Sequence, residues 1–255
     1  MNLKYLVLTV EDGVATVLIN HPDKGNSMSP DVLREMGDLF EHLSAREDVT
    51  VVILTGGEKI FCAGFDLDEI QGIDLAGNAD FVALYNRTYR SIRFCSQPVL
   101  AAIGGAAVAG GFDLTQMCDM RYASERARFS QREVIISLIP VLDPLWRIIG
   151  YGNALDWALT GRMIDVQEAQ RVGFVTRIYP EGTVVREVTA IAREMASLDR
   201  RCLVETKRLS HIVANNNVDG SLKTHEWLFR SYIGSDDNKA RIEALLKTVR
   251  DKRGK

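Results

Sequence analysis

The sequence predicts an α/β fold in which buried strands alternate with helices, followed by a helical C-terminal region. The runs VTVVILTG (49–56) and VLAAI (99–103) are predominantly apolar, as in strands covered on both faces of a sheet. The segment 31–46 instead carries apolar residues at helical spacing. Only helical patterns follow residue 195, so we predict two domains, 1–194 and 195–255.

Turn and capping signals predict the elements of the N-terminal half. Asp12-Gly13, between two alternating segments, predicts a β-hairpin. Ser29-Pro30 is typical of a helix start, with an N-cap followed by proline at the first helical position. The predicted elements are a hairpin at 3–10 and 14–20, a loop at 21–30, a helix at 31–46, strands at 49–56 and 99–103, and a helix at 78–94.

Shorter periodic segments predict the rest of the chain. A run of small residues, Gly104–Gly111, follows the second buried strand and opens a helix. The elements predicted after it are a helix at 111–118, a strand at 120–123, a strand beginning at Phe129, helices at 151–160 and 166–172, a strand at 175–180 and helices from 183 onward.

Length, composition and charge exclude several function classes. The chain has 255 residues, 46% of them hydrophobic, and a net charge of −3. No block of basic residues predicts nucleic-acid binding, and no apolar stretch is long enough to span a bilayer. The first residues, MNLKYLVLTVEDG, lack the pattern of a signal peptide, so we expect a cytoplasmic protein without membrane partners.

The cysteines and histidines are scattered along the chain. Their spacing matches no metal-binding motif, so we expect reduced thiols and no metal site. They are Cys62, Cys95, Cys118, Cys202, His21, His42, His211 and His225.

Two turns built from small residues follow buried strands, Cys62–Phe65 and Gly104–Gly111. Backbone N–H groups at such turns and at helix starts have no partner in the helix. Two that converge on one point form an oxyanion hole, whereas the alternative is close packing of strand against helix. The chain has no clean G-x-G-x-x-G, so a dinucleotide site is less favoured.

Three acids follow the second turn: Asp113, Glu133 and Asp143. Asp113 and Glu133 have apolar sequence neighbours, which favours a raised pKa and general acid–base catalysis if the carboxyl groups are buried. The alternative is that they face solvent at the edges of their elements.

Three segments in order, FCAGFDL, PVLAAIGGAAVAGGFDLTQMCDMRYASERARFSQREV and LTGRMIDVQEAQRVGFVTRIYP, resemble the enoyl-CoA hydratase/isomerase (crotonase) family. The resemblance covers residues 1 to about 250. It implies a spiral core of ββα turns and a helical C-terminal region that forms homotrimers or dimers of trimers. It also implies acyl-CoA thioester substrates of fatty acid metabolism, with no cofactor besides the coenzyme A of the substrate.

The resemblance also assigns residues. The family stabilises a thioester enolate with two backbone amides, here those of Phe65 and Gly110. Lys24 matches a position near the adenine, and Lys207 one that reaches coenzyme A phosphates, although both also fit ordinary solvated lysines. The residues expected along coenzyme A are Lys24, Ala63, Gly64, Asp66, Leu67 and Lys207.

The two acids of the family's hydratases correspond to Asp113 and Glu133. In a hydratase the pair shares one water, which adds to the β-carbon while a proton reaches the α-carbon. Asp113 is one methylene shorter than the usual glutamate. The set Asp113, Glu133 and Asp143 also resembles the dienoyl-CoA isomerases, so hydration is our leading hypothesis and isomerisation the alternative.

The segment Pro140–Arg147 departs from the family, which has a glycine-rich loop there. Trp146 then either extends the apolar wall beside the acyl group or packs in the core. Asp143 is also a candidate nucleophile, as in dehalogenase-like hydrolysis of a thioester. A hypothesis from another class is a non-catalytic member that binds acyl-CoA or RNA, although no basic patch favours RNA.

Overall fold

The computed structural model describes residues 3–75 and 78–253. The chain divides into two compact units, Met1–Leu203 and Val204–Lys255. The domain boundary expected after residue 194 stays a prediction, because a division by internal contacts does not test which part folds alone.

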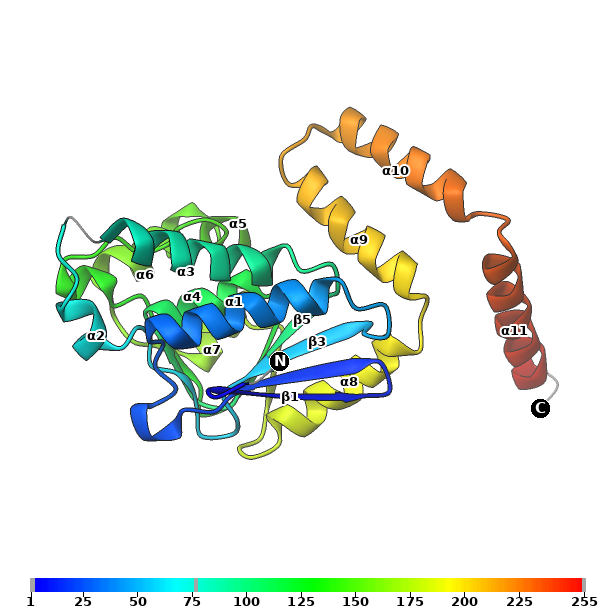
Figure 1. Ribbon diagram of the computed structural model, residues 1–255. Helices are drawn as coiled ribbons and strands as arrows, with labels where there is room; N and C mark the ends of the chain where they lie inside the picture. The colour runs from blue at the N-terminus through cyan, green and yellow to red at the C-terminus, as the bar shows by residue number, and fades with distance from the viewer. Residues whose placement is uncertain (1–2, 76–77, 254–255) are drawn as a thin grey trace. The chain divides into compact units, whose positions relative to one another are not determined.

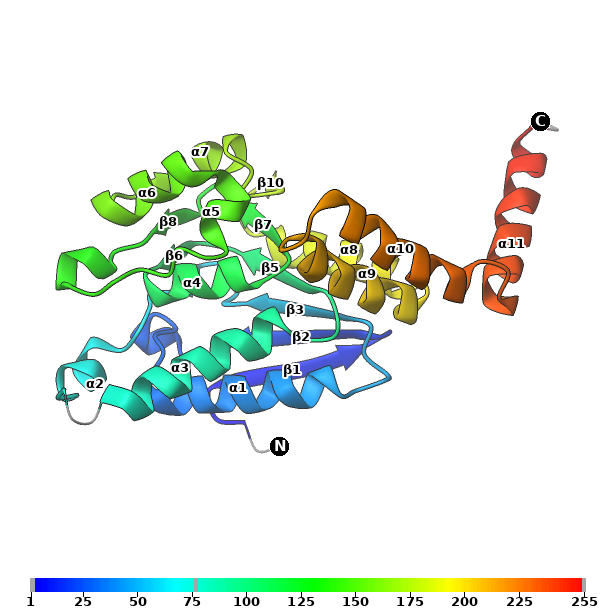
Figure 2. The same ribbon diagram turned by 90° about the horizontal axis from the view of Figure 1, so that it is seen from above.

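The larger sheet of the first unit has six strands in the order β1-β2-β3-β5-β7-β10 (Figure 2). β1 is antiparallel to β2, and all other pairs are parallel. Asp12 and Gly13 both have positive φ, as the predicted hairpin turn requires. The strands are β1 (Leu6–Glu11), β2 (Val14–Ile19), β3 (Val51–Thr55), β5 (Val99–Ile103), β7 (Met120–Ser124) and β10 (Arg177–Tyr179).

A smaller sheet has four strands in the order β4-β6-β8-β9. β4, β6 and β8 each come directly after a strand of the larger sheet in the chain. The chain therefore repeats a ββα unit, for example β5, β6 and then a helix, which confirms the predicted fold. The elements of this layer are β4 (Ile60–Cys62), β6 (Ala106–Val108), β8 (Arg128–Ser130), β9 (Ile164–Asp165), α2 (Leu67–Gln71), α3 (Asn78–Arg93) and α4 (Gly110–Met117).

Both faces of the larger sheet are covered (Figure 1). In β3, Val52 and Leu54 belong to the main core with α1 (Pro30–Ser44). Val51 and Ile53 belong to a second cluster with α8 (Val184–Ala196). Alternate residues of a strand face opposite sides, so a strand buried on both sides reads as one apolar run.

The strand predicted to begin at Phe129 is β8, which begins one residue earlier. It ends at Ser130 and pairs with the three residues of β6. Glu133–Ile136 then forms a 3-10 turn, and Ile139 is 92% exposed. The chain therefore leaves the sheet after Ser130, and Glu133 lies at the start of the 3-10 turn.

The remaining elements are helical. Of the helices in the described ranges, none is long and apolar enough to cross a membrane. They are η1 (Pro22–Lys24), η2 (Glu133–Ile136), α5 (Leu145–Ile149), α6 (Tyr151–Thr160), α7 (Val166–Arg171), α9 (Arg200–Val213), α10 (Val218–Tyr232) and α11 (Asp236–Arg253).

Candidate active site

The turn after β4 exposes one backbone amide. The Met28 amide donates to the Gly64 carbonyl (2.8 Å), and the Asp66 amide donates to the Met28 carbonyl (3.0 Å). These two bonds form a parallel bridge between Met28 and Phe65, in which the N–H of Phe65 itself points away from Met28. Gly64 has a φ of +104°, which L side chains rarely adopt.

The start of α4 supplies the second amide. The Asp113 amide donates to the Ala109 carbonyl (3.0 Å) as the first bond of the helix, so the Gly110 amide precedes the helical ladder. Ala109 has a φ of +49°, an uncommon conformation for a residue with a side chain. Strain of this kind concentrates at functional sites.

The two turns touch each other. A Cβ placed on Gly64 would lie 3.4 Å from the Gly110 nitrogen and 3.0 Å from the Val108 carbonyl oxygen. A Cβ on Gly110 would lie 3.3 Å from the Phe65 ring. Because Gly64 and Gly110 have no side chains, the two turns approach closely, and the amides of Phe65 and Gly110 lie near each other.

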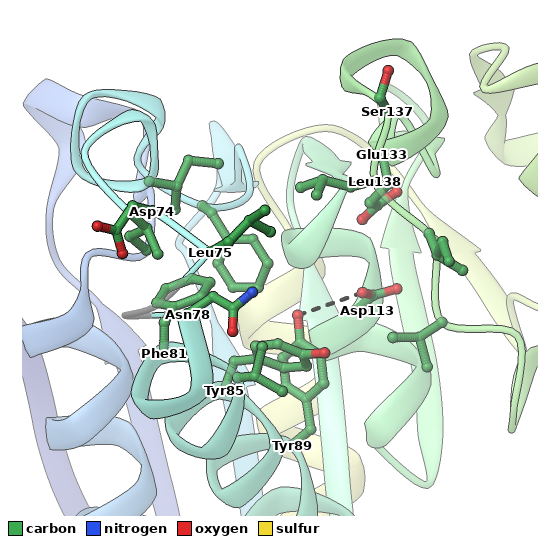
Figure 3. Close-up of a pocket in the computed structure, with 16 residues that line it drawn as sticks. Asp74, Leu75, Asn78, Phe81, Tyr85, Tyr89, Asp113, Glu133, Ser137 and Leu138 are labelled. Carbon is green, nitrogen blue, oxygen red and sulfur yellow. Dashed lines mark hydrogen bonds between the residues drawn. The ribbon is translucent and has the colours of Figure 1, made fainter.

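Asp113 and Glu133 line one cavity of about 530 Å³ (Figure 3). Their side chains are buried, with relative exposures of 3% and 5%. Asp113 is fixed because α4 is buried along its whole length, and the Phe112 ring stacks on Phe174 at 4.9 Å. The solvent-facing alternative for these two acids is wrong.

The two carboxyl groups have different partners. Asp113 Oδ1 accepts a hydrogen bond from Gln116 Nε2 (2.7 Å), and Asp113 Oδ2 accepts one from the Tyr89 hydroxyl (3.4 Å). Both carboxylate oxygens of Glu133 are buried without a hydrogen-bond partner among the described residues. A buried acid without donors has lost water and gained nothing that stabilises its charge.

Burial raises the pKa of both acids. For Asp113 the neighbouring Glu133 charge raises the pKa further, whereas hydrogen bonds from Gln116, Gln131 and Tyr89 lower it. Burial is also the main cause of the raised pKa of Glu133. Two acids with raised pKa values in one apolar cavity are suited to moving protons near neutral pH.

An aromatic wall forms one side of the cavity. It consists of Phe65, Phe81, Tyr85 and Tyr89, whose neighbouring ring centroids lie 5.2 to 5.9 Å apart. In Figure 3, Tyr85 and Tyr89 on α3 face Asp113 and Glu133 across the cavity. Such a lining accommodates an apolar acyl group, with the acids as its few polar contacts.

The structure does not bring Asp143 to this cavity. Asp143 accepts hydrogen bonds from Trp146 Nε1 (3.2 Å) and Arg147 Nε (3.1 Å), and it is not a lining residue. Trp146 is 41% exposed and also absent from the lining, so the interpretation of this residue as core is wrong. The catalytic role of Asp143 stays a prediction.

The residues expected along coenzyme A lie mainly around the turn at 63–67. Lys24 Nζ lies 2.9 Å from Asp68 Oδ2 and 3.6 Å from Asp66 Oδ2. The side chain of Asp66 also caps α2 by accepting from the Asp68 amide. Ala63 and Leu67 are exposed beside this group.

Lys207 lies on α9 in the second unit, where its side chain is largely buried. Its expected contact with coenzyme A stays a prediction.

Sequence analysis missed three polar residues around Asp113: Tyr89, Gln116 and Gln131. Gln116 stands three residues after Asp113 on one helix, a spacing that places both side chains on one face. Phe81, Tyr85 and Tyr89 recur every fourth residue, which also indicates one face of a helix. These two spacings are the features of the sequence from which Gln116 and Tyr89 could have been found.

Two buried acids in one apolar cavity, with the Phe65 and Gly110 turns in contact beside it, define a site suited to proton transfer. The family model described as enoyl-CoA hydratase/isomerase matches residues 9–251. The chain belongs to this family, and the enzyme class predicted from the sequence is confirmed.

Relatives and solved structures agree over almost the whole chain. A probable enoyl-CoA hydratase of Rhizobium meliloti is 30% identical over 251 residues, covering 96% of each chain. A peroxisomal Δ(3,5)-Δ(2,4)-dienoyl-CoA isomerase of Arabidopsis thaliana is 29% identical over 262 residues, covering 96% of this chain and 94% of the relative. The crystal structure of an enoyl-CoA hydratase from Bacillus anthracis superposes with a TM-score of 0.92 at 28% identity, covering 96% and 97%.

Proposed function

We propose that this protein hydrates a 2-enoyl-CoA thioester. The observation that carries the proposal is the pair of buried acids, Asp113 and Glu133, which line one apolar cavity beside the Phe65 and Gly110 turns. In the proposed reaction the thioester oxygen accepts hydrogen bonds from the amides of Phe65 and Gly110, which stabilise it as negative charge develops.

Different surroundings support different roles for the two acids. Hydrogen-bond donors around Asp113 stabilise a carboxylate. The Asp113 carboxylate therefore takes a proton from a water molecule while the oxygen of that water bonds to the β-carbon. Glu133 accepts no hydrogen bond from a side chain among the described residues, and burial raises its pKa, which favours its protonated form. Glu133 then gives its proton to the α-carbon of the enolate, and the product is a 3-hydroxyacyl thioester.

Isomerisation of an enoyl- or dienoyl-CoA is the second candidate. An aspartate at 113 and the 29% identity to a dienoyl-CoA isomerase favour it. Dehalogenase-like hydrolysis through Asp143 has no such support, because Asp143 pairs with Arg147 outside the cavity lining.

Mass spectrometry of enoyl-, dienoyl- and aryl-CoA thioesters incubated with the protein tests these activities. Hydration gives a product heavier by one water, whereas isomerisation leaves the mass unchanged and shifts the ultraviolet band of the conjugated chain. Binding without turnover of any thioester would overturn the proposal in favour of a non-catalytic acyl-CoA-binding member.

We further propose that the turn at 63–67 follows the coenzyme A, with no cofactor besides the one in the substrate. Ala63, Gly64, Asp66 and Leu67 would contact its pantetheine, with Lys24 and Lys207 at its adenine and phosphates. Lys24 already pairs with Asp68 and Asp66, so binding of an anion would compete with these carboxylates. Lys24→Ala should weaken coenzyme A binding severalfold in calorimetry, and unchanged binding would remove Lys24 from the site.

A homotrimer or a dimer of trimers in the cytoplasm is the assembly we propose. Exposed apolar side chains on α10 and α11 support association, because contiguous patches of this kind mark interfaces. Light scattering during gel filtration measures the mass of the particle, and a monomer would contradict this part of the proposal.

A further inference from the structure

Gln116 connects the Asp113 carboxyl group to the loop that carries Val141. Its Nε2 lies 2.7 Å from Asp113 Oδ1 and 3.1 Å from the Val141 carbonyl oxygen. An amide nitrogen carries two hydrogens, so one group can serve both acceptors at once. Gln116 has a relative exposure of 0%, so water does not compete for these bonds.

The loop end of this connection is held a second time. Gln131 Nε2 donates to the same Val141 carbonyl at 2.7 Å. Val141 lines the cavity, and so does Glu133, which begins the segment that leads to it. The position of Asp113 is thereby tied to the wall that carries the other acid.

Gln116 also has an unfavourable feature. Its Oε1 is buried and has no hydrogen-bond partner among the described residues. An apolar side chain would avoid the cost of burying this oxygen. The amide is therefore difficult to explain by packing alone, whereas its two bonds lead directly to the site.

We propose that Gln116 is a positioning residue, whose amide holds the Asp113 carboxylate and the Val141 carbonyl in one arrangement. For its effect on turnover this inference rests on the proposed function, in which Asp113 is the base. Gln116 itself does not line the cavity and acts through Asp113.

Loss of the amide has a defined electrostatic consequence. The titratable groups that face Asp113 are Glu133 from η2 and Tyr89 from α3, and the remaining polar neighbours are the amides of Gln116 and Gln131. A donor to a carboxylate favours its charged form. Removing Gln116 Nε2 therefore raises the pKa of Asp113 further above its ordinary value.

The experiment compares Gln116→Met with Gln97→Met. Gln97 is a matched control, because it is equally buried and its Nε2 also joins two carbonyl oxygens, those of Leu43 (2.9 Å) and Arg46 (3.0 Å). Its amide lies outside the cavity lining. Carbon-13 NMR of aspartate-labelled protein follows the Asp113 carboxyl group during a pH titration, with Asp113→Asn identifying its signal.

We expect Gln116→Met to move the Asp113 titration midpoint upward by about 1 to 2 pH units, the size of a hydrogen bond to a charged group. Gln97→Met leaves it unchanged. In kinetics, the acid limb of kcat/KM moves to higher pH in the same variant, and kcat falls about 10- to 100-fold through misplacement of the base.

An unchanged midpoint in Gln116→Met, or an equal shift in Gln97→Met, would overturn the proposal. If Gln116→Met does not fold, Gln116→Asn replaces it, because its amide is one methylene too short for both acceptors and should shift the midpoint in the same direction. The titration needs no turnover. If the wild-type protein is inactive on every thioester, the proposed function is rejected. The titration of Asp113 still decides whether Gln116 positions its carboxyl group.

Discussion

At the residue scale, the two acids of the cavity have unequal surroundings. Asp113 accepts hydrogen bonds from Gln116 and Tyr89, whereas Glu133 has no partner for either oxygen among the described residues. Burial raises the pKa of each acid, and that of Asp113 lies well above its ordinary value. Side-chain donors oppose the shift at Asp113, whereas at Glu133 its own backbone amide does. The side-chain donors at Asp113 are the observation on which its proposed role as the base rests.

Glu133→Gln should lower kcat/KM at least about 100-fold, because the amide has no proton to give to the α-carbon. Glu47→Gln is the control, since Glu47 is exposed on the surface. Steady-state kinetics on a 2-enoyl thioester measures both. Near-normal turnover by Glu133→Gln would remove this residue from the mechanism.

The raised pKa of Glu133 also affects stability. Above the ordinary glutamate value of 4.5 the unfolded chain loses this proton, while the folded protein retains it up to its higher pKa. The contribution of this proton to the free energy of unfolding is therefore fully present below pH 4.5, and it is lost as the pH rises toward the pKa of Glu133 in the folded protein. Urea unfolding should show Glu133→Gln to be more stable than wild type at neutral pH, with the difference vanishing at acid pH. A difference that grows at acid pH would contradict the shift.

The sequence shows Asp113 two residues after the glycine-rich run, at a helix start where secondary structure fixes the distance. The choice of Glu133 as its partner came from the family resemblance, and both acids line one cavity. Tyr89 and Gln131 could not be predicted in this way. They reach Asp113 from other elements, and their contact depends on tertiary packing. Asp143 was expected near the acids, but it pairs with Arg147 one helical turn away.

At the scale of elements, the site depends on how closely the turn after β4 meets the start of α4. Gly64 has a φ of +104°, and an added Cβ would lie 3.0 Å from the Val108 carbonyl oxygen and 3.1 Å from Ala109 Cβ. A side chain there separates the two turns and strains the backbone.

Gly64→Ala should therefore lower kcat about 100- to 1000-fold, the cost of losing an oxyanion-hole donor. Gly152→Ala in α6 is the matched control, because nothing lies within 4 Å of its added Cβ. Circular dichroism verifies that both variants fold. Full activity of Gly64→Ala would show that the two amides do not act together.

The aromatic face of α3 should set the preference for the acyl group. Phe81→Ala removes one ring of the wall, so KM for a bulky acyl thioester should rise about 10-fold or more, from lost apolar contact. The control is Phe94→Ala, because Phe94 follows the same helix but is 56% exposed and outside the lining. An equal KM for large and small acyl groups in both variants would contradict this role.

The buried strands and amphipathic helices could be predicted because the spacing of apolar residues along the local sequence indicates them. The short length of β8 could not, because this strand pairs with only the three residues of β6. The number of residues over which two strands pair depends on both strands, so the sequence of one strand alone does not predict it.

At the scale of the whole molecule, the second unit exposes large apolar side chains on its described helices. Exposed apolar side chains of this kind mark interaction surfaces, and they are the observation that supports the proposed assembly. These side chains include Val218, Leu222, Trp227 and Phe229 on α10, Ile233 directly after it, and Leu245 on α11.

Trp227→Asp should reduce the oligomer to smaller species, because it places a charge where we expect an apolar interface. Light scattering measures the particle mass, and Lys247→Asp on α11 is a control at an exposed polar position. An unchanged mass for Trp227→Asp would locate the interface elsewhere. The family resemblance supplied this prediction, because association depends on surfaces that one chain's periodicity does not describe.

The most direct test of hydration by the Asp113 and Glu133 pair uses water labelled with oxygen-18. A 2-enoyl-CoA thioester is incubated with the wild-type protein in this water, and the product is analysed by mass spectrometry. Hydration gives a 3-hydroxyacyl thioester that carries one labelled oxygen on the β-carbon. A product of unchanged mass, without label and with a shifted double bond, would contradict hydration and establish isomerisation.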